Sequence, residues 1–407
     1  MVSVDNQIVH NPQMKSLYLF TTNYPYSTPE SFLEEEIKYL SKQFERVVIL
    51  AFYGMETPHR QVPDNCEVVR IPLGANRLRY IVLGTFHPRT IGVLTREFFR
   101  NKVYQSKTKL KAWGSSGRYI NNCLYNRKLM SILQGMRRED ICYFYWGIGQ
   151  NLLSIVLKGK VHLVSRFHGQ WDLWEESYGG FHSLRTEVAQ NLDKAVFIAK
   201  KGEAYFKTRY PNTPTVVFPL GTRDNGVQQD NPNDGIVRVM SCSSIYPLKR
   251  VPLIFEALNN LTDLRIEWTH IGDGKDFEQL KEKVKNEKRE HLTVNLLGRL
   301  KNSEVLDFYR LHHCDMFVNM STSEGVPVAI MEAMSFNIPV LATDVGCTCE
   351  EVVPQVGELL SPNPTIEEII EKMRKILSST YTPREYWKGH YAAAKNYAEF
   401  AEMLFNL

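Results

Sequence analysis

Residues 321–334, which read STSEGVPVAIMEAM, constrain the fold of this chain more than any other stretch. The residues just before them, 314–320, form a short apolar run that predicts a buried strand. Pro327 suits the first turn of a helix, where its missing N–H group is no loss. The predicted order is therefore strand, loop and helix.

This stretch places two carboxylates, Glu324 and Glu332, eight positions apart. On a helix that separation corresponds to about 80° of rotation, so both side chains can address one ligand from roughly the same side. The free N–H groups at the start of the helix favour an anion such as a phosphate. The simpler alternative is two solvated glutamates that share no ligand.

The pattern S-x-x-E-G-x-P-x-x-x-x-E-A-M, followed by PVLATDVG at residues 339–346, resembles the donor-site signature of retaining glycosyltransferases with the GT-B fold. These are family 4-like enzymes, many of which make bacterial polysaccharide or lipopolysaccharide. The resemblance implies that Glu324 binds sugar hydroxyls and Glu332 the nucleotide ribose. It also implies that the backbone between them, at Gly325 and Val326, meets the donor.

The length of 407 residues predicts two domains. Strand, helix and strand patterns over residues 17–22, 30–44 and 47–52 favour a parallel sheet covered on both faces. A polar stretch at 222–235 has the composition of a linker. We therefore expect an α/β protein of the GT-B type, in which two Rossmann-like, doubly wound domains face a central cleft. The predicted domains are 1–222 for the acceptor and 223–383 for the donor, and the resemblance implies that a final helix near 384–407 packs back on the first domain.

In the first domain, a polar cluster follows the predicted strand at 161–167, where α/β folds place their ligands. It contains His168 and Asp172, which resemble the acceptor-domain loop of the same family, whose histidine lies near the transferred sugar. The loop after the first strand holds Ser27 and Thr28 in place of the glycines common in the family. These hydroxyls are weaker candidates for the site.

In the second domain, the adjacent cations Lys249 and Arg250 precede a predicted helix and suit a diphosphate. The family commonly has an arginine at the position of Ser244, so Arg250 is a candidate replacement for it. Arg299, at the end of the predicted strand at 292–299, is a candidate contact of the nucleotide base. Gly346 is a candidate for a close backbone approach to the donor, and Cys347, where the family usually has glycine, is expected to line the cleft.

The charge is uneven along the chain. Between residues 76 and 140, fourteen Lys and Arg face three acidic residues, a local charge of about +11. Such basic segments mixed with aromatic residues suit anionic lipid headgroups or an anionic acceptor, and no nucleic-acid motif accompanies them. No apolar run is long enough for a membrane helix and residues 1–13 lack the core of a signal peptide, so a cytoplasmic location is expected, at or near the inner face of the membrane.

The sequence thus predicts a retaining hexosyltransferase that uses a UDP- or GDP-linked sugar in surface polysaccharide or glycolipid synthesis. No cofactor or metal is expected, since cations and a helix dipole would stabilise the diphosphate. The alternatives are a sugar-nucleotide epimerase or hydrolase on the same fold, and a catalytically silent subunit that binds a partner or membrane. A glycosidase that uses the two glutamates as acid and nucleophile would not explain the neighbouring cations.

Overall fold

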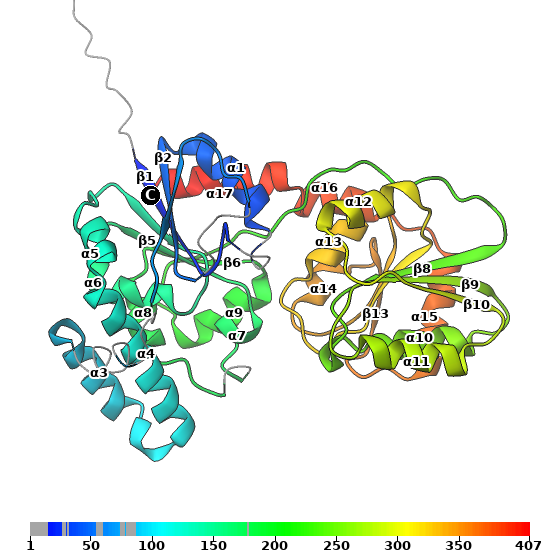
Figure 1. Cartoon of the computed structure of the whole chain (residues 1–407), viewed down its shortest axis with the longest axis horizontal. Coiled ribbons are helices and arrows are strands. Elements are labelled where there is room, and N and C mark those ends of the chain that lie inside the picture. Colours follow the sequence, from blue (N-terminus) through cyan, green and yellow to red (C-terminus); the bar gives the residue numbers. More distant parts are fainter. Residues whose placement is uncertain are drawn as a thin grey trace, which may run out of the picture.

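The chain forms two lobes, each built on a parallel β-sheet with helices packed against it (Figure 1). The computed structural model describes residues 15–26, 30, 32–53, 60–73, 78, 87–176 and 179–407. The two parallel-sheet, Rossmann-like lobes predicted from the sequence are confirmed. The first sheet ends at Val217 and the second begins at Ile236, and the predicted boundary at 222/223 lies between them.

The first sheet has seven strands in the order β3-β2-β1-β4-β5-β6-β7, so the direction of winding reverses between β1 and β4. The strands are β1 (Ser16–Thr21), β2 (Arg46–Ala51), β3 (Cys66–Arg70), β4 (Ile141–Phe144), β5 (His162–Phe167), β6 (Lys194–Phe197) and β7 (Thr215–Val217). The helices of this lobe are α1 (Leu33–Gln43), α3 (Pro88–Arg100), α4 (Lys107–Tyr125), α5 (Arg127–Gln134), α6 (Ser154–Leu157), α7 (Gln170–Leu173), α8 (Arg185–Asn191) and α9 (Lys200–Arg209), with 3-10 turns η1 (Val103–Gln105) and η2 (Gln150–Leu153).

The second sheet has six strands in the order β10-β9-β8-β11-β12-β13. They are β8 (Ile236–Cys242), β9 (Arg265–Ile271), β10 (Leu292–Leu296), β11 (Met316–Asn319), β12 (Val340–Thr343) and β13 (Gly357–Leu360). The helices after β8 in the chain are α10 (Val251–Asn260), α11 (Phe277–Glu287), α12 (Asn302–Leu311), α13 (Val328–Ser335), α14 (Thr348–Glu351), α15 (Ile366–Ser378), α16 (Pro383–His390) and α17 (Ala393–Phe405), with a 3-10 turn η4 (Pro247–Lys249).

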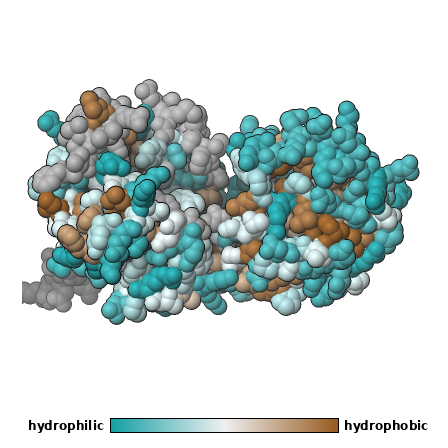
Figure 2. All heavy atoms as spheres, turned by 90° about the horizontal axis from the view of Figure 1, so that it is seen from below, coloured by the Kyte–Doolittle hydropathy of each residue, from teal (hydrophilic) through white to brown (hydrophobic). Residues whose placement is uncertain are grey.

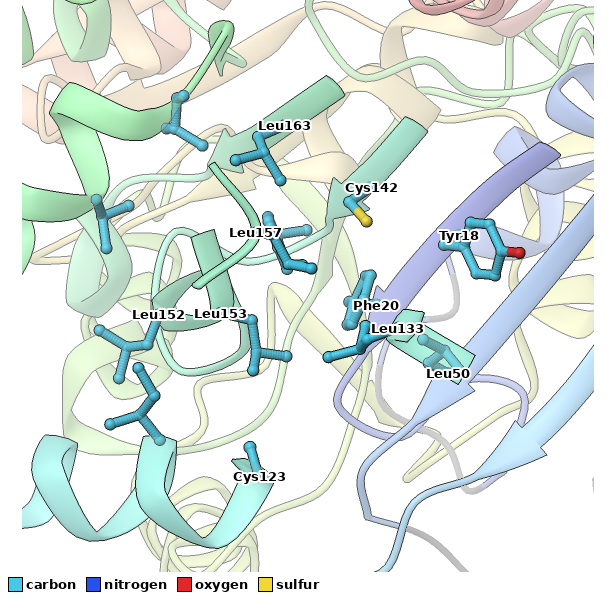
Figure 3. Packing of buried hydrophobic residues seen from close by; sticks show 14 of the residues in the cluster. Tyr18, Phe20, Leu50, Cys123, Leu133, Cys142, Leu152, Leu153, Leu157 and Leu163 are labelled. Carbon is cyan, nitrogen blue, oxygen red and sulfur yellow. The ribbon is translucent and has the colours of Figure 1, made fainter. Parts of the chain in front are cut away.

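Both faces of the first sheet are buried, which explains why its strands are continuously apolar. Along β1, Leu17 and Leu19 pack into one cluster, while Tyr18 and Phe20 pack into the cluster on the opposite face. Figure 3 shows the second of these clusters, where Phe20 lies near Leu50 and Leu133. This packing fixes the carboxyl ends of the strands, from which the loops discussed below emerge.

The chain crosses between the lobes twice, and the two crossings lie side by side. Thr222 forms an isolated parallel bridge with Ala392, and the Trp387 indole donates to the Thr222 hydroxyl at 2.8 Å. Beyond this point α17 lies against α1 of the first lobe (Figure 1), where Phe400 and Leu404 share a cluster with Leu17. No helix in the described part of the chain is both long and apolar enough to span a bilayer.

Candidate functional site

Glu324 lies in the loop between β11 and α13, at the carboxyl edge of the second sheet. Its side chain is 6% exposed, and its Oε1 accepts from the Lys249 ammonium at 2.5 Å and from the Ser321 hydroxyl at 2.5 Å. The Asn319 amide is a third, longer donor at 3.4 Å. Lys249 and Glu324 are 75 positions apart in the chain, so the structure brings together an acid and a base that the sequence proposed separately.

The loop of Glu324 rests on the backbone of Gly346. Gly346 has φ +58°, and a Cβ atom added there would lie 1.8 Å from the Glu324 carbonyl oxygen. The next N–H group, of Cys347, donates to the Gly325 carbonyl at 3.2 Å. The backbone of Gly346 therefore packs directly against the loop that carries Glu324. Cys347 is buried in an apolar cluster that also contains Ile198 and Leu220 of the first lobe, and its place beside a ligand stays a prediction.

Arg250 points in a different direction from its neighbour Lys249. Its backbone has φ +47°, and its guanidinium turns back onto the chain leading to Glu324. The Nε atom donates to the Met320 carbonyl at 2.6 Å, and Nη2 donates to the Ser321 carbonyl at 3.0 Å. The sequence predicts that Arg250 binds a phosphate. In the structure its guanidinium instead donates to the backbone of the loop that carries Glu324.

Glu332 lies on α13 and is 9% exposed. The Asn302 amide donates to its Oε1 at 2.7 Å. Burial raises the pKa of this carboxyl to about 7, and the Asn302 hydrogen bond and the charge of Arg223 only partly offset that effect. A carboxyl with such a pKa changes its charge near neutral pH.

His168 follows β5 in the first lobe and is held by Asp172. The His168 Nδ1 lies 3.3 Å from the Asp172 Oδ2, and the His168 backbone N–H donates to Oδ1 at 3.0 Å. The Gly147 N–H also donates to Asp172, at 3.2 Å. Because both oxygens of Asp172 accept hydrogen bonds, this residue positions His168. The His168 Nε2 has no hydrogen-bond partner within the described part of the chain.

Aromatic rings fix the plane of the His168 imidazole. The ring centroid lies 4.4 Å from that of Trp146 and 4.8 Å from that of Tyr145, both from the loop after β4. With Nδ1 turned toward Asp172, the buried Nε2 is the ring nitrogen that has no partner among the described residues.

The two lobes meet at His168 and Gly325. A Cβ atom added to Gly325 would lie 2.4 Å from the His168 carbonyl oxygen, so no side chain fits at this position. A second contact comes from Glu350, whose carboxylate accepts from the backbone N–H groups of Lys200 and Lys201 at 2.8 and 2.7 Å. Glu350 of the second lobe therefore caps the start of α9 in the first lobe. The sequence around Glu350 does not predict this role, because no local signal indicates a partner 150 positions away.

The remaining predicted residues of the second lobe, Ser244, Arg299 and Val326, lie after strands of the second sheet. Ser244 is exposed in the loop after β8, and Arg299 is exposed after β10. Val326 is buried and packs in the core next to α13. Ser27 and Thr28 lie outside the described residues. Ser244 and Arg299 thus share an edge with Lys249 and Glu324, whereas only the backbone of Val326 is left to face a ligand.

No group of three His, Cys, Asp or Glu side chains suited to a metal ion occurs among the residues that the structure describes. Metal-independent binding of a donor stays a prediction. The fold brings the Lys249–Glu324 pair of the second lobe next to the segment of the first lobe that carries the oriented imidazole of His168. Glu332 is a separate buried carboxyl on α13.

Comparison with known proteins finds similarity to glycosyltransferases. Residues 223–395 match the family model described as Glycosyl transferases group 1. An uncharacterized glycosyltransferase of Methanocaldococcus jannaschii is 23% identical over 297 residues, which cover 72% of this chain and 80% of the relative.

Two solved structures resemble nearly the whole chain. The apo form of the lipopolysaccharide outer core galactosyltransferase WaaB superposes with a TM-score of 0.67 at 16% identity, covering 97% of this chain and 98% of that one. HepE of Anabaena, in complex with UDP and glucose, superposes with a TM-score of 0.62 at 16% identity, covering 97% and 100%. The chain has the GT-B fold. The resemblance to GT-B glycosyltransferases predicted from the sequence is confirmed, and the family match lies in the lobe that carries Glu324 and Glu332.

Proposed function

We propose that this chain is a retaining glycosyltransferase that moves a hexose from a UDP- or GDP-linked donor to a glycan or lipid-linked acceptor in surface polysaccharide synthesis. The observation that carries the proposal is the pairing of Lys249 with Glu324 in the second lobe, at the point where Gly325 meets His168 of the first. A site made from both lobes can hold a donor on one side and an acceptor on the other.

In the proposed reaction the bond between the anomeric carbon and the diphosphate oxygen breaks, and the acceptor oxygen forms the new bond on the same face of the sugar. The acceptor hydroxyl gives its proton to the departing diphosphate. Lys249 and the start of α13 stabilise the charge on the departing diphosphate. Glu324 accepts hydrogen bonds from sugar hydroxyls, and Glu332 accepts them from the ribose. His168 faces the sugar from the first lobe, oriented by Asp172.

Nucleotide binding should depend on pH through Glu332. Only the ionised carboxylate accepts from both ribose hydroxyls, and with a pKa of about 7 the ionised fraction falls about tenfold between pH 8 and pH 6. A thermal-shift screen with UDP, GDP and ADP should show stabilisation by one of them, with an affinity about tenfold weaker at pH 6.

The matched control is Glu332→Gln, in which nucleotide binding should be weaker and the same at both pH values. Without nucleotide, the raised pKa means that the folded protein binds the proton more tightly than the unfolded chain does. The contribution of Glu332 to the free energy of unfolding is therefore greatest below its pKa in the unfolded chain, and it is lost as pH rises through 7. As pH rises from below the unfolded pKa to above 7, wild type should lose stability relative to Glu332→Gln. Absence of any nucleotide-induced shift would favour the catalytically silent alternative.

We further propose that helices α3 to α5 contact an anionic membrane surface. Residues 87–134 contain ten Lys and Arg against the single acid Glu97, a net charge of +9. Phe99, Tyr104 and Leu110 are exposed among these cations. Figure 2, which views the molecule from below, shows hydrophobic and hydrophilic side chains interspersed on the left lobe. This combination suits lipid headgroups.

Liposomes that contain anionic lipid should sediment the protein at low salt, and neutral liposomes should not. Lys107→Gln with Lys111→Gln on α4 should weaken the binding by roughly tenfold or more, since each cation near the surface contributes ~1 kcal/mol. The matched control is Lys281→Gln with Lys285→Gln on α11 of the other lobe, where both side chains are exposed. Equal loss in the two double variants would contradict a membrane contact through α4.

A further inference from the structure

A cavity of about 110 Å³ lies in the first lobe between α4, the loop after β4 and the start of α8. Ser116 of α4, the backbone of Gly147 and Gly149, and the side chains of His182 and Arg185 line it. In Figure 1 these helices lie together in the lower part of the left lobe. None of the cavity-lining side chains belongs to the site predicted from the sequence.

Arg185 is the one permanent positive charge in the wall of this cavity, and it is 6% exposed. Its Nη2 donates to the Asp172 carbonyl at 2.8 Å, and its guanidinium lies 5.0 Å from the centre of the Phe167 ring. The Nη1 group has no hydrogen-bond partner, and no carboxylate forms an ion pair with Arg185 in the described chain. A buried guanidinium left without an anion is costly unless a ligand compensates it.

The Asp172 and Glu175 carboxylates attract this charge at longer range without forming an ion pair with it. The other titratable neighbours do not neutralise it. Burial, reinforced by the nearby Arg185, lowers the pKa of His182 to about 3, so His182 is neutral at physiological pH. Glu97 accepts from the Ser183 hydroxyl at 2.6 Å, and Glu187 pairs with Arg100 at 3.2 Å. Both carboxylates are therefore engaged elsewhere, and the cavity presents a positive wall.

The cavity adjoins His168 through one shared residue, Asp172. The carboxylate of Asp172 holds His168 and the Gly147 N–H, while its carbonyl accepts from Arg185. The loop that carries Gly147 follows β4, next to the point where the strand order reverses, which is where open α/β sheets bind ligands. On the outer side, Ser116 shares α4 with the exposed cations Lys107, Lys111 and Arg118.

We propose that this cavity is an acceptor subsite for a compact anionic group, either a phosphoryl or a carboxylate, carried by the acceptor. The inference rests on the proposed transferase function and adds a substrate class to it. Arg185 would pair with the anion through its free Nη1, and the Ser116 hydroxyl and the backbone N–H groups of Ile148 and Gly149 would supply further donors. An acceptor held in this way places its neutral sugar hydroxyls toward His168.

The test is a calorimetric titration of the full chain with methyl phosphate, with glucuronate and with neutral methyl glucoside. It is done in a Lys249→Met background, so that anion binding at the donor site does not contribute. We expect saturable binding of at least one anion and none of methyl glucoside. Which anion binds more tightly distinguishes a phosphorylated acceptor from an acidic sugar.

Ser116→Asp provides the decisive variant, since it leaves Arg185 and its contact with Asp172 in place. The new carboxylate occupies the cavity wall and should weaken anion binding by about tenfold or more, whereas the isosteric neutral Ser116→Asn should change it less than about threefold. Arg185→Gln should abolish the binding, with circular dichroism and melting temperature as checks of the fold.

Two outcomes would overturn the proposal: no saturable anion binding in the Lys249→Met background, or equal affinities in Ser116→Asp and Ser116→Asn. Failure of the transferase function is separately visible, because wild type would then show no stabilisation by nucleotide whatever the anion titration gives.

Discussion

Glu324→Gln should lower kcat for sugar transfer by at least about 100-fold while the protein still folds and binds nucleotide. The amide keeps the size of the side chain but offers one acceptor oxygen in place of a carboxylate, so sugar hydroxyls lose the charged partner that orients them. At the same time Lys249, now 2.5 Å from a neutral group, loses its counter-ion and becomes more available to the diphosphate. The donor KM should therefore stay the same or fall, and steady-state kinetics separates the two effects.

The matched control is Glu371→Gln, the same substitution at an exposed position on α15 of the same lobe, which should leave kcat unchanged. A Glu324→Gln enzyme with wild-type kcat would remove Glu324 from the mechanism. An enzyme that turns over the donor equally well without any acceptor would instead favour the epimerase or hydrolase alternative.

The fold was predictable because its determinants are local. The apolar runs around Leu19, Ile49 and Val164 are strands buried on both faces, and such runs are visible in any short window of sequence. The strand, loop and helix around Glu324 could be predicted for the same reason, since Pro327 and the apolar run before it lie within a few residues.

Side-chain direction was not predictable to the same degree. Lys249 and Arg250 are adjacent cations, and the sequence alone predicts the same role for both, which is to bind a diphosphate. The left-handed backbone at Arg250, with φ +47°, turns its guanidinium toward the Met320 and Ser321 carbonyls, 70 and 71 positions away. Nothing in a local window indicates that turn.

Glu350 and Arg185 could not be predicted as notable residues, because their contacts join residues that are far apart in the sequence. Glu350 caps α9 of the opposite lobe, and Arg185 becomes notable only once burial and the lack of a carboxylate partner are known. An arginine at the start of a helix is otherwise typical of a solvated surface. Long-range packing thus decides which charged residues are buried, paired or left without a partner.

The buried pair of Glu36 and Arg166 should give the largest loss of stability on a single substitution. Both side chains are fully buried, 2.5 Å apart, and they join α1 to β5. The Tyr143 hydroxyl also donates to Glu36, at 3.0 Å, and the Arg166 guanidinium lies 4.1 Å from the centre of the Phe400 ring on α17. Glu36→Leu should cost ~3–5 kcal/mol, because it leaves the Arg166 charge buried without its partner. Urea unfolding of the variant and wild type measures this difference.

The double variant Glu36→Leu with Arg166→Met shows whether the loss of stability comes from an unpaired buried charge or from lost packing. Replacing both partners removes the desolvated charge, so stability should return to within about 2 kcal/mol of wild type, whereas Glu402→Leu, at an exposed position on α17, should have little effect. If the double variant were as unstable as Glu36→Leu, the loss would come from packing and not from the unpaired charge. Arg166 lies on the strand that ends just before His168, so a recovered double variant with low activity would show that the ion pair also sets the position of the imidazole.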